Sequence, residues 1–206
     1  MEPGFADAYA PREIADRLEA ACLAKAATPL LSLVMLGVLA GAFIGLGSLF
    51  SVIVFSDPAL GFATARVLGG TVFSLGLLLV VVAGAELFTG NNPLAMAWAD
   101  RRLGMREVLH NWTVVALANF AGAAGLAVLV FLSGHAGMNG GRVGAAYLEI
   151  AAAKSSLPLA EAFFRGVLCN VLVCLAVWMA LGGRSCCRSS PATWWAAACW
   201  SRSSTT

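Results

Sequence analysis

Charged residues are scarce in this chain of 206 residues, at 12%, while hydrophobic residues make up 60%. The mean hydropathy of +0.83 is far from that of a soluble domain, whose core has no room for so much apolar surface. The net charge of +2 is too small and too dispersed for a nucleic-acid partner, so none is expected. The composition predicts an integral membrane protein surrounded by a lipid bilayer.

Cysteine is present but lacks the paired spacing of a zinc site or of a disulfide framework. Cys169 and Cys174 fall inside an apolar run, and we interpret the six cysteines as small apolar residues. Neither a metal site nor a cofactor is expected.

Four apolar runs are long enough to cross a bilayer, which takes roughly 20 helical residues. They cover residues 29–55, 67–85, about 111–134 and about 162–183. The first contains no charged residue, and its Gly37, Gly41 and Gly45 recur at a spacing of four. Small residues on one stripe of a helix favour close helix packing in lipid.

The second run ends at Glu86 and is followed by Gly90-Asn91-Asn92-Pro93 and a short apolar stretch, 94–99. This pattern predicts a broken helix whose polar groups face protein or water, because lipid offers backbone groups no partners. Pro93 suits the first turn of the restarting helix, and Asn91 or Asn92 can cap that helix. The free N–H groups at the start of the helix favour a nearby anion. The alternative is a loop at the membrane surface, with 94–99 an interfacial helix.

Glu86 itself allows two interpretations. An intramembrane carboxylate indicates a functional site, or it ties down the N–H groups of its own loop. We favour the structural role for Glu86, together with Gly90, Asn91 and Pro93.

Residues 1–28 predict a short surface helix, with apolar Ile14, Leu18 and Ala21 at helical spacing. Acidic residues come first in this stretch, so it is not a signal peptide. Basic residues gather before the first span, after the broken second span and after the fourth, which predicts a cytoplasmic N-terminus.

An internal repeat emerges when Lys25 is laid on Lys154, an offset of 129 residues (154 − 25). Pro29 then falls on Pro158, and Gly37-Val38-Leu39 falls on Gly166-Val167-Leu168. With three spans in each unit, the two units have inverted topology, which is a transporter architecture. A second broken helix is expected beyond the last residue, so the chain holds four of six spans.

Several motifs together resemble the formate/nitrite transporter family, from Lys25 to about Ser185. They are Ala40-Gly41-Ala42-Phe43, Phe73-Ser74-Leu75-Gly76, Gly84-Ala85-Glu86-Leu87-Phe88-Thr89, Asn111-Trp112 and the run 165–178. The resemblance implies an all-α, aquaporin-like helical bundle in the bacterial inner (plasma) membrane. It also implies a homopentamer with one pore per protomer for formate, nitrite or hydrosulfide, and no enzyme chemistry.

The resemblance also assigns residues to the pore. Those matched to the path are Phe73, Leu77, Leu87, Phe88, Thr89, Lys154 and Asn170. An apolar constriction excludes hydrated ions, while the Thr89 hydroxyl and a positive field receive a partly dehydrated anion. Taken alone, Phe73 and Leu77 are equally typical of packing, and Lys154 of an ordinary surface lysine. The family's histidine on the second broken helix has no counterpart, because His110 and His135 lie near the ends of the third span.

The predicted organisation is an N-terminal helix at 1–28, an incomplete channel domain at 29–183 and an aberrant tail at 184–206. The tail has the composition of a gene read in the wrong frame; alternatively it is a true variant with tryptophans at the headgroups and lipidated Cys186 and Cys187. Three functions remain open: an anion channel, a pore for another small solute, and a truncated member that inserts without conducting.

Overall fold

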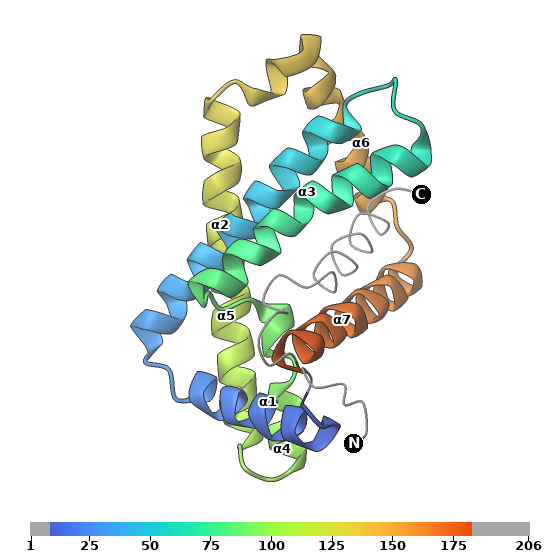
Figure 1. The fold of residues 1–206 in the computed structure, drawn as a ribbon. Helices are drawn as coiled ribbons and strands as arrows, with labels where there is room; N and C mark the ends of the chain where they lie inside the picture. The colour runs from blue at the N-terminus through green and yellow to red at the C-terminus, as the bar shows by residue number, and fades with distance from the viewer. Residues whose placement is uncertain (1–8, 183–206) are drawn as a thin grey trace, which may run out of the picture.

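The structure, a computed structural model, describes residues 9–182, and the regular elements of that part of the chain are all helical (Figure 1). They are α1 (Pro11–Ala26), α2 (Leu30–Phe55), α3 (Phe62–Ala83), η1 (Phe88–Asn91), α4 (Leu94–Ala99), α5 (Met105–Leu132), η2 (His135–Gly141), α6 (Arg142–Ser155) and α7 (Leu159–Gly182). The tail predicted at 184–206 lies outside the described residues.

The four longest helices, α2, α3, α5 and α7, are long and apolar enough to cross a membrane. At 1.5 Å per residue they measure roughly 33 to 42 Å, against about 30 Å of hydrocarbon. Large apolar side chains cover their outer surface, and Phe120 and Phe131 of α5 are 75% and 78% exposed. Such exposure is costly in water but suits lipid or a protein partner, so the four predicted spans are confirmed.

α2 crosses α5 at very short range because glycine occupies the contact on both helices. A Cβ on Gly37 would lie 2.6 Å from Cβ of Ala118, and one on Gly41 would overlap the backbone of Asn119. Gly122 of α5 is equally close to α2, since a Cβ at this position would overlap the backbone of Val38. The predicted role of the glycine stripe in close packing is confirmed.

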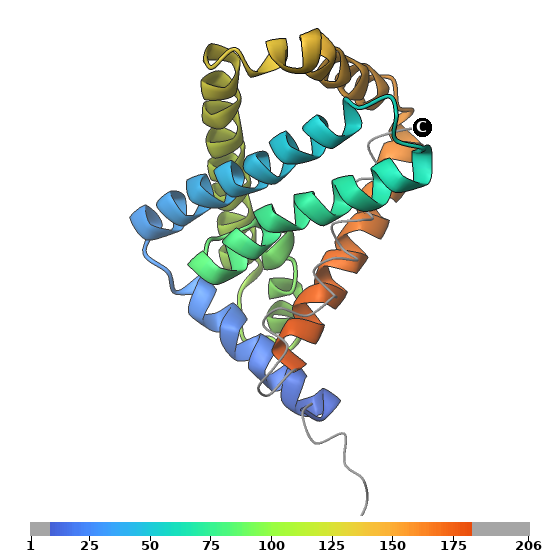
Figure 2. The ribbon, with the colours of Figure 1, turned by 45° about the horizontal axis from the view of Figure 1, so that its top comes forward.

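The opposite side of α2 packs on α3 by the same device, and both views show these two helices side by side (Figures 1 and 2). A Cβ on Gly47 would lie 2.7 Å from the carbonyl oxygen of Phe73, and one on Gly76 2.7 Å from that of Phe43. Both backbones need these positions to be glycine. α2 is therefore held between α3 and α5.

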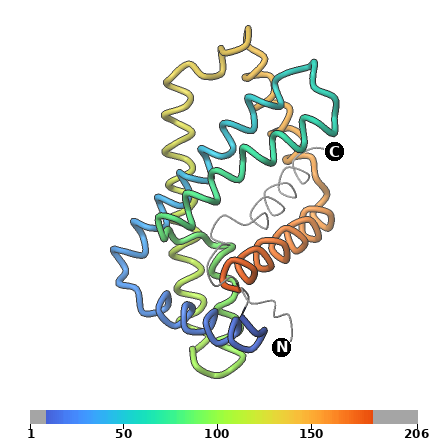
Figure 3. The backbone as a smooth tube through the Cα atoms, in the orientation of Figure 1, coloured from blue at the N-terminus to red at the C-terminus, as the bar shows by residue number. Residues whose placement is uncertain are grey.

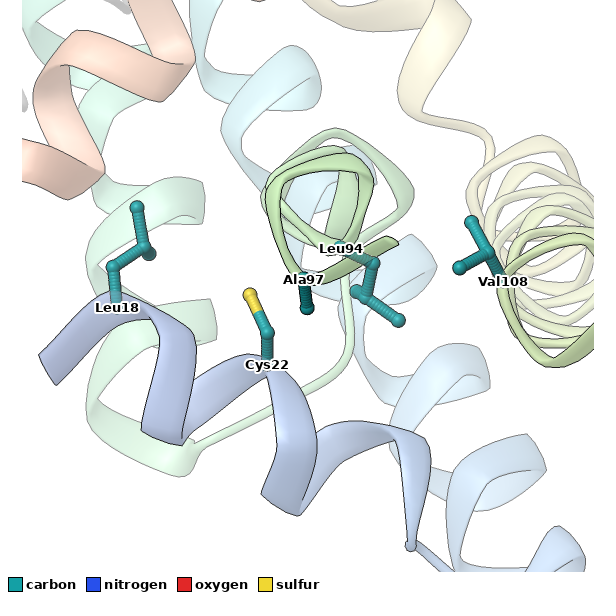
Figure 4. Close-up of a cluster of buried hydrophobic side chains, with 5 residues drawn as sticks. All are labelled: Leu18, Cys22, Leu94, Ala97 and Val108. Atoms are coloured by element: carbon teal, nitrogen blue, oxygen red, sulfur yellow. The ribbon is translucent and has the colours of Figure 1, made fainter. Parts of the chain in front are cut away.

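α1 lies across one end of the bundle and packs on α4 and α5 (Figure 4). The buried contact joins Leu18 and Cys22 of α1, Leu94 and Ala97 of α4, and Val108 of α5. Burial raises the pKa of the Cys22 thiol, which therefore stays neutral and packs as an apolar residue. The helix predicted within 1–28 is confirmed, although Cys22, rather than Ala21, completes its most buried stripe with Ile14 and Leu18.

The predicted repeat extends to the helix ends. α1 ends at Ala26 and α2 begins at Leu30, while α6 ends at Ser155 and α7 begins at Leu159, each pair 129 residues apart (155 − 26 and 159 − 30). The carbonyl oxygens of Pro29 and Pro158 accept equivalent bonds, from Leu33 N at 2.9 Å and from Ala162 N at 3.0 Å.

The two units also run in opposite directions (Figure 3). α1 and α6 lie at opposite ends of the molecule, and α7 returns toward the end where α2 begins. A bond from Tyr9 N to the carbonyl oxygen of Gly182, 2.8 Å long, joins the end of α7 to the start of α1. The fold is the predicted inverted repeat of helices, with four spans in the described part.

Several boundaries differ from the prediction: α3 begins at Phe62 rather than Val67, and α7 at Leu159 rather than about Ala162. α5 begins at Met105 rather than near Asn111, because Gly104 and Glu107 form a capping arrangement with a 2.8 Å bond from Gly104 N to Oε2 of Glu107. The segment between the third and fourth spans was expected to be a connection, but it contains α6. The repeat explains that helix, since α6 is the counterpart of α1.

We expect Gly41→Ala to destabilise the protein by about 1–3 kcal/mol, because the new methyl group would force α2 away from α5. Denaturation in mixed micelles measures the free energy of unfolding. Gly125→Ala is the matched control, since no atom lies within 4 Å of a Cβ there. Equal stability of the two variants would contradict the close crossing.

Candidate functional site

The interruption of the second span begins at Gly84. This residue ends α3 in the left-handed region, with φ 65° and ψ 28°, where glycine carries no steric penalty. The chain then runs extended through Leu87 into the short helix η1, and α4 begins after Pro93. Ala85 and Glu86 are each only 6% exposed, so the segment passes through the interior. The predicted break is present, and its first residues are buried in the protein rather than exposed in a loop.

The Glu86 side chain forms an ion pair across the bundle. Nζ of Lys25, in the last turn of α1, lies 3.1 Å from Oε2 of Glu86. The same ammonium donates a 2.7 Å hydrogen bond to Oδ1 of Asn91. The partner of Glu86 is therefore Lys25 of another helix rather than N–H groups of its own loop, and a structural role for Glu86 stays a prediction.

Asn91 is the most enclosed polar residue of this segment, with 0% exposure. Its Nδ2 donates to Oδ1 of Asn111 at 3.0 Å, and its carbonyl oxygen accepts a 2.9 Å bond from Nε1 of Trp112. With Lys25, these contacts anchor the segment to α1 and α5. The side chain is therefore not a helix cap, and the expectation that Asn91 caps α4 is wrong.

Asn92 does not cap α4 either, because Nδ2 of Asn92 donates a 2.6 Å bond to Oδ1 of Asn170 on α7. Pro93 occupies the cap position, with backbone bonds from Ala95 N to Asn92 O and from Met96 N to Pro93 O. Both asparagine side chains are used between helices, where an unpaired amide would be costly. α4 is only six residues long.

Two of the predicted pore residues meet at one cavity. Leu77 of α3 and Leu87 of the broken segment both line a space of about 240 Å³ between α1, α3 and α7. Phe73 lies one helical turn before Leu77 and is buried. Phe88 packs edge-on against Trp112, with ring centroids 6.3 Å apart, and Thr89 and Gly90 are half-buried in η1.

The other two predicted path residues lie toward α7. Asn170 lines a larger cavity of about 770 Å³, together with Asn92 and Pro93. Lys154, at the end of α6, is exposed as a whole residue, yet the atoms around its ammonium group desolvate it and lower its pKa; the nearby Cys169 thiol acts in the opposite direction. Lys154 thus interacts with the residue that precedes Asn170.

Asn119 was missed by the sequence reasoning, although its side chain makes two hydrogen bonds with the broken segment. Its side chain bonds Gly37 of α2 as well as Glu86 and Phe88 of the segment. An amide in the middle of a span is costly without partners, and Asn170, which the resemblance matches to the path, is such an amide. The same argument, applied to the third span, identifies Asn119.

A helix-interrupting segment that is buried between the spans of an inverted repeat defines an integral membrane protein of the channel and transporter class. Comparison with known families makes the assignment specific. The family model described as Formate/nitrite transporter matches residues 12–203, and the chain belongs to this family. The match continues beyond residue 184, where we expected likeness to end; a change of reading frame there stays a prediction.

Individual relatives agree with this assignment. The chain is 38% identical over 180 residues to the uncharacterized transporter YrhG of Bacillus subtilis, covering 84% of this chain and 66% of the relative. It is 36% identical over 180 residues to the formate channel FocA of Haemophilus influenzae, covering 86% and 63%. The chain thus spans about two thirds of the length of these relatives.

Solved structures give the same fold. A pentameric formate channel with formate bound superposes with a TM-score of 0.76 at 30% identity, covering 86% of this chain and 70% of that one. An FNT family ion channel gives a TM-score of 0.78 at 26% identity, covering 95% and 78%. The chain is accordingly a multi-pass membrane protein with the fold of these channels.

We expect Lys25→Met to destabilise the protein by about 2 kcal/mol, because Glu86 and Asn91 would both lose a charged hydrogen-bond donor away from water. Unfolding in mixed micelles measures the change. Arg106→Met, at an exposed position of α5, is the control and should change stability little. A loss no larger than that of the control would show that the pair does not anchor the segment.

Proposed function

We propose that this chain forms the path of a channel for small monovalent anions, formate or nitrite, with hydrosulfide as a further substrate. The observation that carries the proposal is the junction of Leu77 and Leu87 at one cavity, beside a segment held inside the bundle. Two apolar side chains that narrow a path exclude hydrated ions and leave a route for a small, partly dehydrated one; Lys25 and Glu86, already paired with each other, line the same cavity. The proposal involves no enzymatic reaction.

The path in this proposal has four parts. The apolar side chains that narrow it are Phe73, Leu77, Leu87 and Phe88. Thr89 offers a hydroxyl, and Asn170 faces the far side of the segment. Lys154 supplies positive charge at the entrance near Cys169. Supporting the last assignment, desolvation lowers the pKa of Lys154 in the folded chain, a perturbation that is common at functional sites.

We further propose a homopentamer in the bacterial inner membrane, with the N-terminus in the cytoplasm. The exposed aromatic surface of α5 supports an assembly, since Phe120 and Phe131 are covered by nothing in the described chain. The ion pair between Arg102 and Glu19, 2.8 Å long, supports the orientation. It brings the basic residues after α4 to the same end of the molecule as those of α1, as the distribution of basic residues on the cytoplasmic side requires.

Two other functions are tested by the same experiment. Purified protein in liposomes should pass formate or nitrite if the anion channel is correct. Passage of a neutral solute such as urea without anion flux would favour a pore for another solute. If neither moves, the chain is a member of the family that inserts without conducting.

Leu87→Trp should lower formate flux by about tenfold or more, because the larger side chain fills the cavity shared with Leu77. Stopped-flow measurement on liposomes gives the rate. Leu31→Trp, at an exposed position near the start of α2, is the control and should leave the flux unchanged. Equal flux in the two variants would place the path elsewhere.

As the pH is raised, formate flux should begin to fall below pH 10.5, the usual pKa of a lysine. The reason is that Lys154 loses its charge at a lower pH than an ordinary lysine does. In Lys154→Arg the positive charge persists, since a guanidinium stays protonated throughout this range, and the alkaline loss should disappear. A pH profile of flux for both proteins measures the difference. Identical profiles would exclude Lys154 from the entrance.

A further inference from the structure

Asn119 occupies the middle of α5, where that helix crosses α2. The crossing is close enough for a side chain of one helix to reach past the other, because Gly37, Gly41 and Gly122 lie in the contact. A polar amide at membrane depth raises the cost of insertion unless its donors and acceptor are used. The hydrogen-bond partners of Asn119 therefore indicate which parts of the structure its side chain holds together.

The amide of Asn119 uses both donors and its oxygen. Nδ2 donates to the carbonyl oxygen of Gly37 at 2.8 Å and to that of Glu86 at 2.9 Å. Oδ1 accepts the N–H of Phe88 at 2.9 Å. One side chain thus joins α2, α5 and the broken segment.

These bonds lie on either side of Leu87. The carbonyl oxygen of the residue before it and the N–H of the residue after it are both held by the same amide. The backbone that carries Leu87 is then fixed in position at both of its ends, and the side chain contacts the cluster of Ala40, Val80 and Ala85. Rotation of this peptide would carry Leu87 away from the cavity that it shares with Leu77.

We propose that Asn119 is the positioning residue of the constriction: it holds Leu87 against the path and so sets the largest anion that passes. The size limit rests on the proposed function, whereas the positioning of Leu87 does not. Asn119 itself touches no permeating ion. It acts through the backbone of the broken segment.

Two variants separate positioning from general packing. Asn119→Leu keeps the number and branching of the side-chain heavy atoms but removes all three bonds. Asn119→Ala removes the same bonds with a smaller side chain. Thr113→Val is the control on the same helix, since within residues 9–182 its hydroxyl bonds only to the carbonyl oxygen of Leu109, at 2.8 Å.

Hydrogen–deuterium exchange of the Phe88 amide in the detergent-solubilised protein reports the positioning directly. In Asn119→Leu we expect exchange about tenfold faster than in the parent protein, because the hydrogen bond that protects this N–H is gone. In Thr113→Val the exchange should stay near that of the parent. Unchanged exchange in Asn119→Leu would overturn the proposal, and if that variant fails to fold, unchanged exchange at Phe88 in Asn119→Ala would do so.

Flux in liposomes reports the size limit. The acetate-to-formate flux ratio should rise about fivefold or more in Asn119→Leu, since discrimination against one extra methyl group depends on a fixed wall. It should stay constant in Thr113→Val. Faster exchange with an unchanged ratio would overturn the role in size selection. If the parent protein passes no anion, the proposed channel function fails, while the exchange experiment still decides whether Asn119 positions Leu87.

Discussion

A peptide group inside a bilayer must find its hydrogen-bond partner within the protein, because lipid supplies none. The break after α3 creates such groups at membrane depth, and the surrounding structure serves to satisfy them. The N–H of Glu86 donates to the carbonyl oxygen of Leu36 at 3.2 Å, and Trp112 donates to the carbonyl oxygen of Asn91. The side chain of Asn119 pairs with the carbonyl oxygen of Glu86 and with the N–H of Phe88. The irregular segment persists because its partners come from α2 and α5 as well as from α1.

Close helix packing is the condition for this arrangement. A side chain as short as asparagine can bridge α5, α2 and the broken segment only if the two helices nearly touch. Glycine at 37, 41 and 122 permits that approach, and an apolar driving force between helices is absent in lipid. Backbone contact and buried amides therefore depend on each other, and they place Leu87 against the cavity that we propose as part of the path.

The inverted repeat gives the two lysines of the chain equivalent places but different surroundings. Lys25 ends α1 and is neutralised by Glu86, while Lys154 ends α6, at the opposite end of the bundle, and is desolvated near Cys169. The two lysines are equivalent because the helix ends next to them recur 129 residues apart, as do Pro29 and Pro158, whose carbonyl oxygens accept equivalent hydrogen bonds. The repeat places one lysine in the anchor of the broken segment and the other at the proposed anion entrance.

The sequence by itself determined the membrane setting, the four spans, the glycine contact, the broken second span and the family. These rest on local signals: long apolar runs, a spacing of four, a Gly-Asn-Asn-Pro interruption and contiguous motifs. It did not determine the partners of Glu86, Asn91 and Asn92, or the part played by Asn119. Those depend on residues 20 to 82 positions apart that meet only when the helices pack. A polar residue in a span signals in sequence that it needs a partner, and only the tertiary structure decides which one, because the partner is chosen by where the crossing helices bring their donors and acceptors.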